Sequence, residues 1–278
     1  DHTGFDIKFY SFIPTSRCIK FGLQKKCIVS LFGIIAPFLI LRRIFPKLSW
    51  IHIKVQDFIM GIFMRKCDIC ISLTGYVYAP RIAQKKGAII IMERGSKHIL
   101  EQKKILEKNP HKKNEAIPNR NIKCNLKAYQ FANFISVASQ HVKESFLLHQ
   151  YPENRIFVNP YGVDLSMFKP LPNIPKKYDV IMVGGWGYEK GCDLIVEAIR
   201  KTNYSFIHVG SIKDVDFPQE KNFTHIDPVD QSKLIEYYNQ AKVFILPSRQ
   251  DGFGMVLSQA LACNLPIIGS NNCGAPDL

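Results

Sequence analysis

This chain of 278 residues is long enough for two domains with separate cores, and its composition excludes a disordered protein. Hydrophobic residues make up 46% of it and charged residues 22%, which is the balance of a globular protein. Its eight cysteines are scattered without the spacing of a disulfide framework, so reduced thiols and a cytoplasmic location are expected.

The net charge of +14 is concentrated in the first 160 residues, where 26 Lys and Arg stand against 10 Asp and Glu. The remaining residues carry a balance of −2, so a general enrichment in Lys does not explain the asymmetry. Such an imbalance predicts that the first half meets an anionic partner. The basic residues lack the interleaved aromatics of a single-strand nucleic-acid groove, so a membrane surface is expected and nucleic acid is not.

Residues 27–41, CIVSLFGIIAPFLIL, form an apolar run between basic residues. As a helix the run spans about 22 Å, short of the roughly 30 Å hydrocarbon core of a bilayer, and Pro37 is expected to break or kink it. The run is therefore either a buried core helix or an interfacial segment, and residues 17–54 become the candidate contact with an anionic membrane. The basic collar consists of Lys25, Lys26, Arg42, Arg43 and Lys47.

Three runs rich in Ile and Val, at 68–73, 88–92 and 134–138, predict buried strands separated by helices with basic faces. Cys67 and Cys70 form a C-x-x-C pair at the first run. Because residues three apart in a strand point to opposite faces, a structural role is expected for them and not a metal or redox site.

Ser139 precedes an apolar-periodic run and is expected to cap a helix there. The Pro-rich stretch at 160–175 then predicts a linker, and strands and helices alternate again after it. On the helix that follows Gly191, one apolar stripe is expected. The fold class is therefore α/β, with two doubly wound Rossmann-like domains at 1–158 and 159–278. The expected stripe consists of Leu194, Ile195, Ala198 and Ile199.

The first Gly-rich loop, VGGWGYEKG at 183–191, joins a predicted strand to this helix. Exposed backbone N–H groups and the helix dipole predict an anion site there. Lys190 stands at the helix start, where a cation is unfavourable for the helix itself. Two interpretations stay open: Lys190 faces a bound phosphate, or it is a solvated turn residue.

The second loop, SRQDGFG at 248–254, leads into a helix at about Met255. Asp251 is either a helix cap or an acceptor for ligand hydroxyls, and the G-F-G between it and the helix favours the second role. Gln259 is expected on the side opposite the core stripe of Leu257, Ala260 and Leu261. Hydroxyls together with phosphate predict a sugar phosphate or a nucleotide sugar as ligand.

These stretches, in this order, resemble the family-4 glycosyltransferases, which are retaining enzymes with the two-domain GT-B fold. The resemblance covers residues 130–278 and rests on FISVASQHVKESF, RIFVNPYGVDLSMFKP, VGGWGYEKGCDLIVEAI and PSRQDGFGMVLSQALACNLPII. It implies a nucleotide-diphosphate sugar as co-substrate, with no metal and no other cofactor. It also implies catalytic positions for Lys190 and Asp251, and donor contacts at Gly184, Gly185, Trp186, Lys190, Asp251, Gly252, Phe253, Gly254, Met255, Val256 and Gln259.

The resemblance assigns roles to these residues. Lys190 would neutralise the donor diphosphate, Asp251 would contact the sugar hydroxyls and Gln259 the ribose, while backbone N–H groups of 252–256 would hold sugar and phosphate. Three positions depart from the family: Gly185 replaces an Arg, and Asp251 and Gln259 replace the two Glu of its E-x7-E pair. Charge that develops on the leaving diphosphate would be stabilised electrostatically.

Four polar residues follow the strand at 88–92 and are candidates for the acceptor side: Glu93, Arg94, Ser96 and His98. Arg94 either faces a phosphate or forms a surface salt bridge. His98 either faces the cleft or lies on the outer face of the next helix.

The function expected is transfer of a hexose-type sugar, with retention, to a hydroxyl of a glycan or lipid-linked acceptor in cell-envelope or polysaccharide biosynthesis. The location expected is cytoplasmic and peripheral at the inner face of the cell membrane. The alternatives are a GT-B epimerase or hydrolase that uses Glu93 and His98 as acid–base groups, and a non-catalytic nucleotide-sugar-binding protein. The chain begins with Asp1 and not Met, and we expect it to be truncated at both ends.

Overall fold

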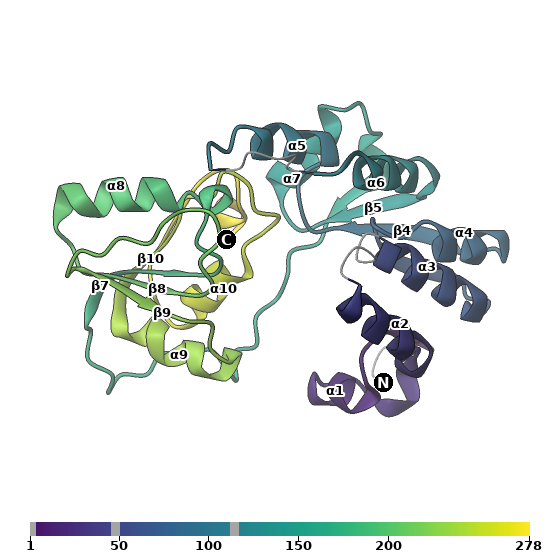
Figure 1. Cartoon of the computed structure of the whole chain (residues 1–278), viewed down its shortest axis with the longest axis horizontal. Helices are drawn as coiled ribbons and strands as arrows, with labels where there is room; N and C mark the ends of the chain where they lie inside the picture. Colours follow the sequence, from purple (N-terminus) through teal and green to yellow (C-terminus); the bar gives the residue numbers. More distant parts are fainter. Residues whose placement is uncertain (1–3, 46–50, 112–116) are drawn as a thin grey trace. The chain divides into compact units, whose positions relative to one another are not determined.

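The computed structural model describes residues 4–45, 51–111 and 117–278 (Figure 1). By its internal contacts the chain divides into two units. The first unit comprises residues 1–92 and 123–133, and the second comprises residues 93–122 and 134–278. Lys47 of the expected basic collar lies outside the described residues.

The first unit combines short parallel strands with helices. Strands β1 and β2 pair in parallel, and β3 is next to β4 in a second sheet. The buried Asp57 of α3 accepts hydrogen bonds from the N–H groups of Val77, Tyr78 and Ala79, at 2.7–2.8 Å, and so caps α4 from another helix. The elements are β1 (Phe9–Ser11), α1 (Thr15–Lys20), β2 (Ile28–Ser30), α2 (Phe32–Ile44), α3 (His52–Phe63), β3 (Ile69–Leu73), α4 (Tyr78–Lys85), β4 (Ile89–Arg94) and α6 (Asn119–Phe131).

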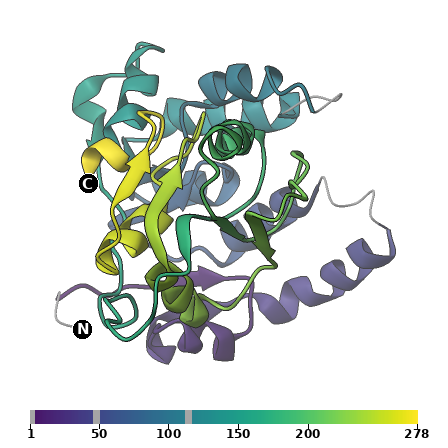
Figure 2. The same cartoon turned by 90° about the vertical axis from the view of Figure 1, so that its left-hand side faces the viewer.

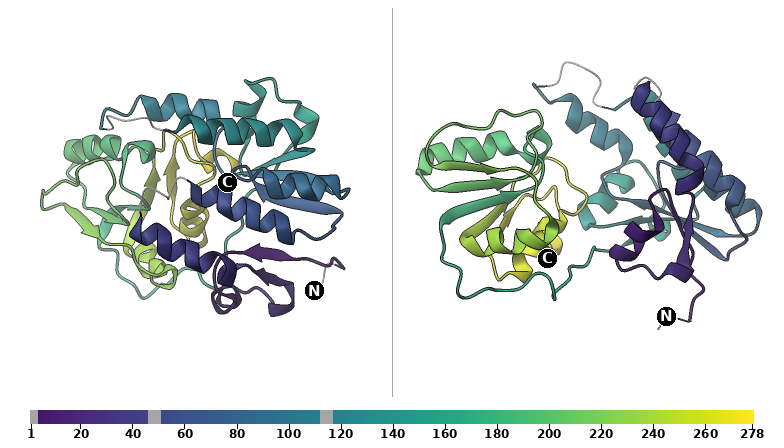
Figure 3. Two further views of the ribbon diagram at one scale, coloured as in Figure 1. Left: turned by 45° about the vertical axis from the view of Figure 1, so that its right-hand side comes forward. Right: turned by 60° about the horizontal axis from the view of Figure 1, so that its bottom comes forward.

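The apolar run at 27–41 is divided between β2 and α2. Helix α2 continues through Pro37 to Ile44, so Pro37 does not end the helix; in its second turn a proline removes a single intrahelical hydrogen bond. Ile35 is fully buried, whereas Ile40 and Leu41 are exposed, so the run is neither wholly buried nor wholly at the surface. Helices α2 and α3, in dark purple and blue in Figure 3, contact each other. Over the described part of the chain, every helix is too short or too polar to span a bilayer.

The C-x-x-C pair lies at the start of β3. Cys67 precedes the strand, and Cys70 is buried within it. Burial raises the pKa of the Cys70 thiol to about 11 and also raises that of Cys67. Since the thiolate is the reactive and metal-binding form, both side chains remain protonated near neutral pH.

The second unit contains a five-stranded parallel sheet in the order β11-β10-β7-β8-β9. Helix α8 covers one face of this sheet, and α9 and α10 cover the other (Figure 1). Figure 2 shows the yellow strand β11 at one edge. The strands are β7 (Tyr178–Val183), β8 (Phe206–Val209), β9 (Phe223–Ile226), β10 (Ala241–Leu246) and β11 (Ile267–Gly269); the helices are α8 (Cys192–Thr202), α9 (Gln231–Gln240) and α10 (Met255–Ala262).

The same unit also contains α5 (Ile99–Glu107), β5 (Phe134–Val137), α7 (Gln140–Leu147) and β6 (Ile156–Val158), with β5 and β6 paired in parallel. Ser139 occupies the N-cap position of α7, as expected, but its hydroxyl does not cap the helix. It donates instead to the carbonyl of Gly252, at 2.5 Å, because it is fully buried against that residue's loop.

The core of the five-stranded sheet corrects the apolar stripe predicted on α8. The buried residues are Cys192, Ile195 and Ile199, whereas Leu194 is 43% exposed and Ala198 is also exposed. Ile195 and Ile199 of the predicted stripe do face the sheet, together with Cys192, at spacings i, i+3 and i+7, and only Leu194 and Ala198 were predicted wrongly.

We predict that Ile195→Ala lowers the free energy of unfolding by about 2–5 kcal/mol, because it removes a fully buried side chain. Leu194→Ala, on the same helix, should cost less than about 1 kcal/mol because Leu194 is already 43% exposed to solvent. Urea unfolding followed by fluorescence of the buried Trp186 measures both values. Equal losses in the two variants would contradict this orientation of α8.

Candidate functional site

Two loops meet where the strand order of the sheet reverses direction. Strands β7 and β10 are neighbours, and the chain proceeds from β7 toward β9 on one side and from β10 to β11 on the other. In doubly wound sheets ligands bind at such a switch point, outside the carboxyl ends of the strands. The loops that leave β7 and β10 there are the two Gly-rich loops of the sequence.

The backbones of the two loops touch at Gly191. This residue has a left-handed φ of 71°, and a Cβ there would collide with the carbonyl of Pro247. Glycine therefore serves both the turn and the close approach. Two further hydrogen bonds join the loops, from the N–H groups of Arg249 and Gln250 to the carbonyl of Glu189, at 2.9 and 3.4 Å.

Lys190 and Asp251 form an ion pair with each other across these loops. Their side chains are only 23% and 17% exposed. Lys190 lies in a short 3-10 turn, Tyr188–Lys190, before α8. Asp251 is not a helix cap, because the N-cap of α10 is Gly254. The two sequence-predicted catalytic candidates are thus brought together, and Lys190 is not a freely solvated turn residue.

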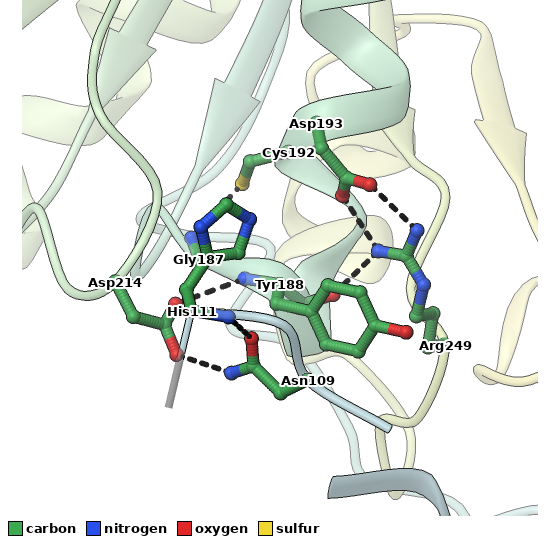
Figure 4. Close-up of polar contacts among 8 residues, drawn as sticks. All are labelled: Asn109, His111, Gly187, Tyr188, Cys192, Asp193, Asp214 and Arg249. Carbon is green, nitrogen blue, oxygen red and sulfur yellow. Dashed lines mark hydrogen bonds and ion pairs between the residues drawn. The ribbon is translucent and has the colours of Figure 1, made fainter. Parts of the chain in front are cut away.

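Arg249 forms a second bridge between the loops (Figure 4). Its guanidinium donates to both carboxylate oxygens of Asp193, at 2.6 and 2.7 Å, and to the carbonyl of Tyr188, at 2.8 Å. It also lies 3.8 Å from the centre of the Tyr188 ring. Burial alone would raise the pKa of Asp193, but the hydrogen bonds and charge of Arg249 lower it.

Sequence reasoning missed this bridge. The signal available was an acidic residue in the first turn of α8, which the helix dipole favours, together with an Arg in the other loop. Their pairing depends on the packing of two segments 56 residues apart in the chain.

The backbone donors of the first loop are mostly used within the protein, which corrects the expectation of an open anion cradle there. The N–H groups of Gly184 and Trp186 donate to the carbonyls of Val209 and Ser211, at 2.9 and 2.8 Å. That of Tyr188 donates to the Asp214 carboxylate at 3.0 Å, and that of Gly187 to the Cys192 sulfur at 3.1 Å (Figure 4).

The second loop keeps a run of free donors instead. Within the described ranges, the N–H groups of residues 252–256 donate to no acceptor of the protein. These residues are Gly252, Phe253, Gly254, Met255 and Val256. The last two begin α10, where N–H groups lack intrahelical partners. These five consecutive donors lie directly after Asp251 in the chain.

Two predicted donor residues have buried side chains. Trp186 is fully buried against Phe206 and His208, so its side chain is not available to a ligand, and its N–H and carbonyl are already hydrogen-bonded within the protein. Gln259 is 6% exposed, and its amide oxygen accepts the Tyr238 hydroxyl at 2.8 Å. The expectation that Gln259 lies away from the packed side of α10 is therefore wrong, because Tyr238 of α9 supplies a buried polar partner.

The acceptor-side candidates lie close to the second loop. A Cβ on Gly252 would collide with the carbonyl of Gly95, and its third-nearest atom is the backbone nitrogen of Ser96, at 3.1 Å. Glu93 accepts the Tyr161 hydroxyl at 3.0 Å. Arg94 donates to the Lys97 carbonyl and to the Gln102 amide, at 2.6–3.1 Å.

His98 is buried at the N-cap of α5, and not on that helix's outer face. Its Nδ1 accepts the Leu100 N–H at 3.4 Å, and its ring stacks on His149 with centroids 4.1 Å apart. Burial, with help from His149 and Arg94, lowers the pKa of His98 to about 3. It is therefore neutral near pH 7.

Two histidines, His208 and His225, lie against the start of the first loop, where His208 contacts the backbone of Gly184. His208 Nε2 lies 2.8 Å from the carbonyl of Gly184, and His208 Nδ1 lies 2.9 Å from His225 Nδ1. Because a carbonyl only accepts, Nε2 carries the proton, and His208 Nδ1 accepts from His225. Burial lowers the pKa of His208 to about 4; His225 adds to this, while the bond to Gly184 opposes it.

We predict that acidification destabilises the protein through His208. The unfolded chain takes up a proton near pH 6.5 and the native His208 only near pH 4, so stability is lost as the pH falls between these values. The free energy of unfolding should fall by about 2 kcal/mol between pH 7 and pH 5. His208→Gln can still donate to Gly184 but does not titrate, so urea unfolding should reveal a shallower pH dependence. An identical pH dependence in the two proteins would contradict the assignment.

The chain is similar to known proteins in sequence and in fold. Residues 166–278 match the family model for Glycosyl transferases group 1. An uncharacterized 41.2 kDa protein in the cps region of Klebsiella pneumoniae is 30% identical over 140 residues, which cover 45% of this chain and 39% of that protein. A probable sucrose-phosphate synthase of Thermosipho melanesiensis is 25% identical over 178 residues, which cover 54% of this chain and 42% of that protein. The matched part of the chain spans between 30% and 42% of the first three curated relatives.

Solved structures share the fold. The Anabaena protein HepE in complex with UDP superposes with a TM-score of 0.59 at 12% identity, over 96% of this chain and 74% of that one. The pneumococcal O-GlcNAc transferase, in complex with UDP and GlcNAc, superposes with a TM-score of 0.55 at 18% identity, over 77% of this chain and 44% of that one. At these identities the likeness concerns the α/β fold alone. In sequence, residues 166–278 therefore resemble the Glycosyl transferases group 1.

Proposed function

We propose that this protein is a glycosyltransferase that takes a hexose-type sugar from a nucleotide-diphosphate sugar. The observation that carries the proposal is the run of five unpaired N–H groups at 252–256, next to the Lys190–Asp251 pair at the switch point of the sheet. Solved structures of the Anabaena protein HepE in complex with UDP, with UDP and glucose, and with UDP-glucose support a nucleotide-sugar donor for this chain.

The ion pair suggests how the donor is bound. A diphosphate carries negative charge that competes with Asp251 for the Lys190 ammonium. Once Lys190 turns to the phosphates, the Asp251 carboxylate becomes free to accept hydrogen bonds from sugar hydroxyls. Binding of the complete donor thus exchanges one internal ion pair for two ligand contacts, whereas a ligand with only one of the two groups leaves a charge unpaired.

The same groups serve the reaction. As the sugar–phosphate bond breaks, negative charge grows on the diphosphate, and Lys190 with the fixed N–H groups of 252–256 stabilises it. No metal or further cofactor is needed in this scheme. Sugar transfer proceeds with retention, and the departing diphosphate takes up the proton of the acceptor hydroxyl.

Gln259 contributes as a donor and not as an acceptor. Its amide oxygen already accepts the Tyr238 hydroxyl, so its NH2 group is the part that remains for a ribose hydroxyl. This differs from a Glu at the same place, which offers acceptors only. The fixed orientation of the Gln259 amide therefore follows from Tyr238.

The acceptor is proposed to be a glycan or a lipid-linked saccharide, in cell-envelope or polysaccharide biosynthesis, approached from the side of Glu93, Arg94, Ser96 and His98. The first 158 residues would bind it at the cytoplasmic face of an anionic membrane. Exposed Ile40 and Ile44 next to Arg42 and Arg43 at the end of α2 support such a contact. A hydrolase or epimerase would need a titrating acid, and neutral, buried His98 does not favour one.

Calorimetric titration with UDP, ADP and GDP and their sugar conjugates tests the donor site. Lys190→Ala should weaken the binding of both the nucleoside diphosphate and its sugar conjugate about tenfold or more, since it removes a charged partner of the phosphates. Asp251→Asn should weaken only the sugar conjugate and leave the nucleoside diphosphate at least as tight, because Lys190 is released. Lys201→Ala, in an exposed pair with Glu197 on α8, is the matched control and should change neither.

Two results would overturn the proposal. One is that the protein binds none of these nucleotides or conjugates. The other is that a nucleotide binds but neither Lys190→Ala nor Asp251→Asn alters its affinity. A conjugate that binds normally but is never turned over with any glycan or lipid-linked acceptor would favour the non-catalytic binding protein.

A further inference from the structure

A second ammonium group lies beside the first Gly-rich loop. The side chain of Lys213, in the segment after β8, extends across Gly185. A Cβ on Gly185 would lie 2.8 Å from the Lys213 Nζ and 3.1 Å from its Cδ. Throughout residues 4–45, 51–111 and 117–278, no side-chain hydrogen bond or ion pair involves Lys213.

Gly185 serves this arrangement by lacking a side chain. Unlike Gly184, whose φ is 130°, Gly185 does not have a left-handed backbone. Its conformation is therefore open to other residues, and what a side chain would disturb is the space that Lys213 fills.

The backbone of Lys213 is fixed against the loop from both sides. Its N–H donates to the Trp186 carbonyl at 2.9 Å, and the Trp186 N–H donates to the Ser211 carbonyl at 2.8 Å. On the other side Asp214 accepts the Tyr188 N–H at 3.0 Å. Trp186 is fully buried, so the segment that carries the exposed Lys213 is anchored in the core.

The carboxylate next to Lys213 in the chain is engaged elsewhere. Asp214 accepts the Tyr188 N–H through Oδ1 and the Asn109 amide through Oδ2, at 3.0 and 2.8 Å (Figure 4). Lys190, the other cation of this loop, is paired with Asp251. Lys213 is thus a cation held at the loop while the neighbouring carboxylates have other partners.

We propose that Lys213 binds the diphosphate of the donor. This inference rests on the proposed function and deepens it, by assigning a phosphate contact to a residue of the β8 segment. Lys213 is available to an incoming anion at once, whereas Lys190 must first leave Asp251. The two lysines approach the phosphates from different segments, and Gly185 leaves the space that the Lys213 side chain fills.

Calorimetric titration of UDP tests the inference. Lys213→Ala should weaken UDP about tenfold and reduce the salt dependence of its binding, because one charge contact is lost. Uridine, which has no phosphate, should bind the variant as it binds the wild type. Lys221→Ala is the control: Lys221 is exposed and lies before β9, at the opposite end of the strand from the switch-point edge.

A second variant acts on Lys213 without removing it. Gly185→Ala places a methyl group where the Lys213 side chain lies, and should weaken UDP by a similar factor. In the double variant the two effects should not add, because both act through the same ammonium group. Melting temperatures of all variants show whether a loss of binding reflects loss of the fold.

The outcomes separate the inference from the function on which it rests. If the wild type binds no nucleoside diphosphate, the proposed function fails and the inference fails with it. If the wild type binds UDP and Lys190→Ala weakens it, but Lys213→Ala does not, only the inference is wrong. Full additivity of Gly185→Ala and Lys213→Ala would also contradict it.

Discussion

The bridge between Arg249 and Asp193 is the interaction on which the rest of the candidate site depends. It joins the loop after β10 to the first turn of α8, and its third hydrogen bond goes to the Tyr188 carbonyl of the first loop. A bidentate Arg–carboxylate pair fixes orientation as well as distance. Lys190 and Asp251 each lie two residues from a residue that this bridge holds, Tyr188 and Arg249, so the bridge joins the two loops that carry the ion pair. The loops are consequently arranged before any ligand arrives, which lowers the entropic cost of binding.

At these two loops, some of the polar groups have partners within the protein and others do not. Lys190 and Asp251 neutralise each other, while the N–H groups at 252–256 and the ammonium of Lys213 have no hydrogen-bond or ion-pair partner among the described residues. A ligand with both phosphates and hydroxyls satisfies all of these groups. A simple anion binds only the N–H groups and the ammonium groups. Asp251 then loses Lys190 as its partner and gains no ligand hydroxyl in its place. Under the proposed function, this arrangement would favour a nucleotide-diphosphate sugar over inorganic anions on electrostatic grounds, before any contact with the base is considered.

Much of the fold followed from local pattern, and much of the site did not. Alternating apolar strands and periodic helices predicted the parallel sheet, and the glycines with Lys190 and Asp251 marked the two loops that meet at its switch point, because these signals are encoded by neighbouring residues. The errors concern partners that only packing supplies. Gln259 is buried because Tyr238 meets it, Ser139 bonds to Gly252 and does not cap α7, and the phase of α8 is set by the sheet beneath it. Arg249 pairs with a residue far away in the sequence, which no local pattern could indicate.

The central claim is that the two loops at the switch point hold a nucleoside diphosphate. Amide hydrogen exchange, measured on the protein with and without saturating UDP, tests it most directly, because exchange reports each backbone N–H separately. The account predicts slower exchange at Gly252, Phe253, Gly254, Met255 and Val256, with smaller changes at 184, 186–188 and 190–191, where the N–H groups are already bonded. Binding of UDP that leaves 252–256 unchanged and protects another part of the chain would contradict it.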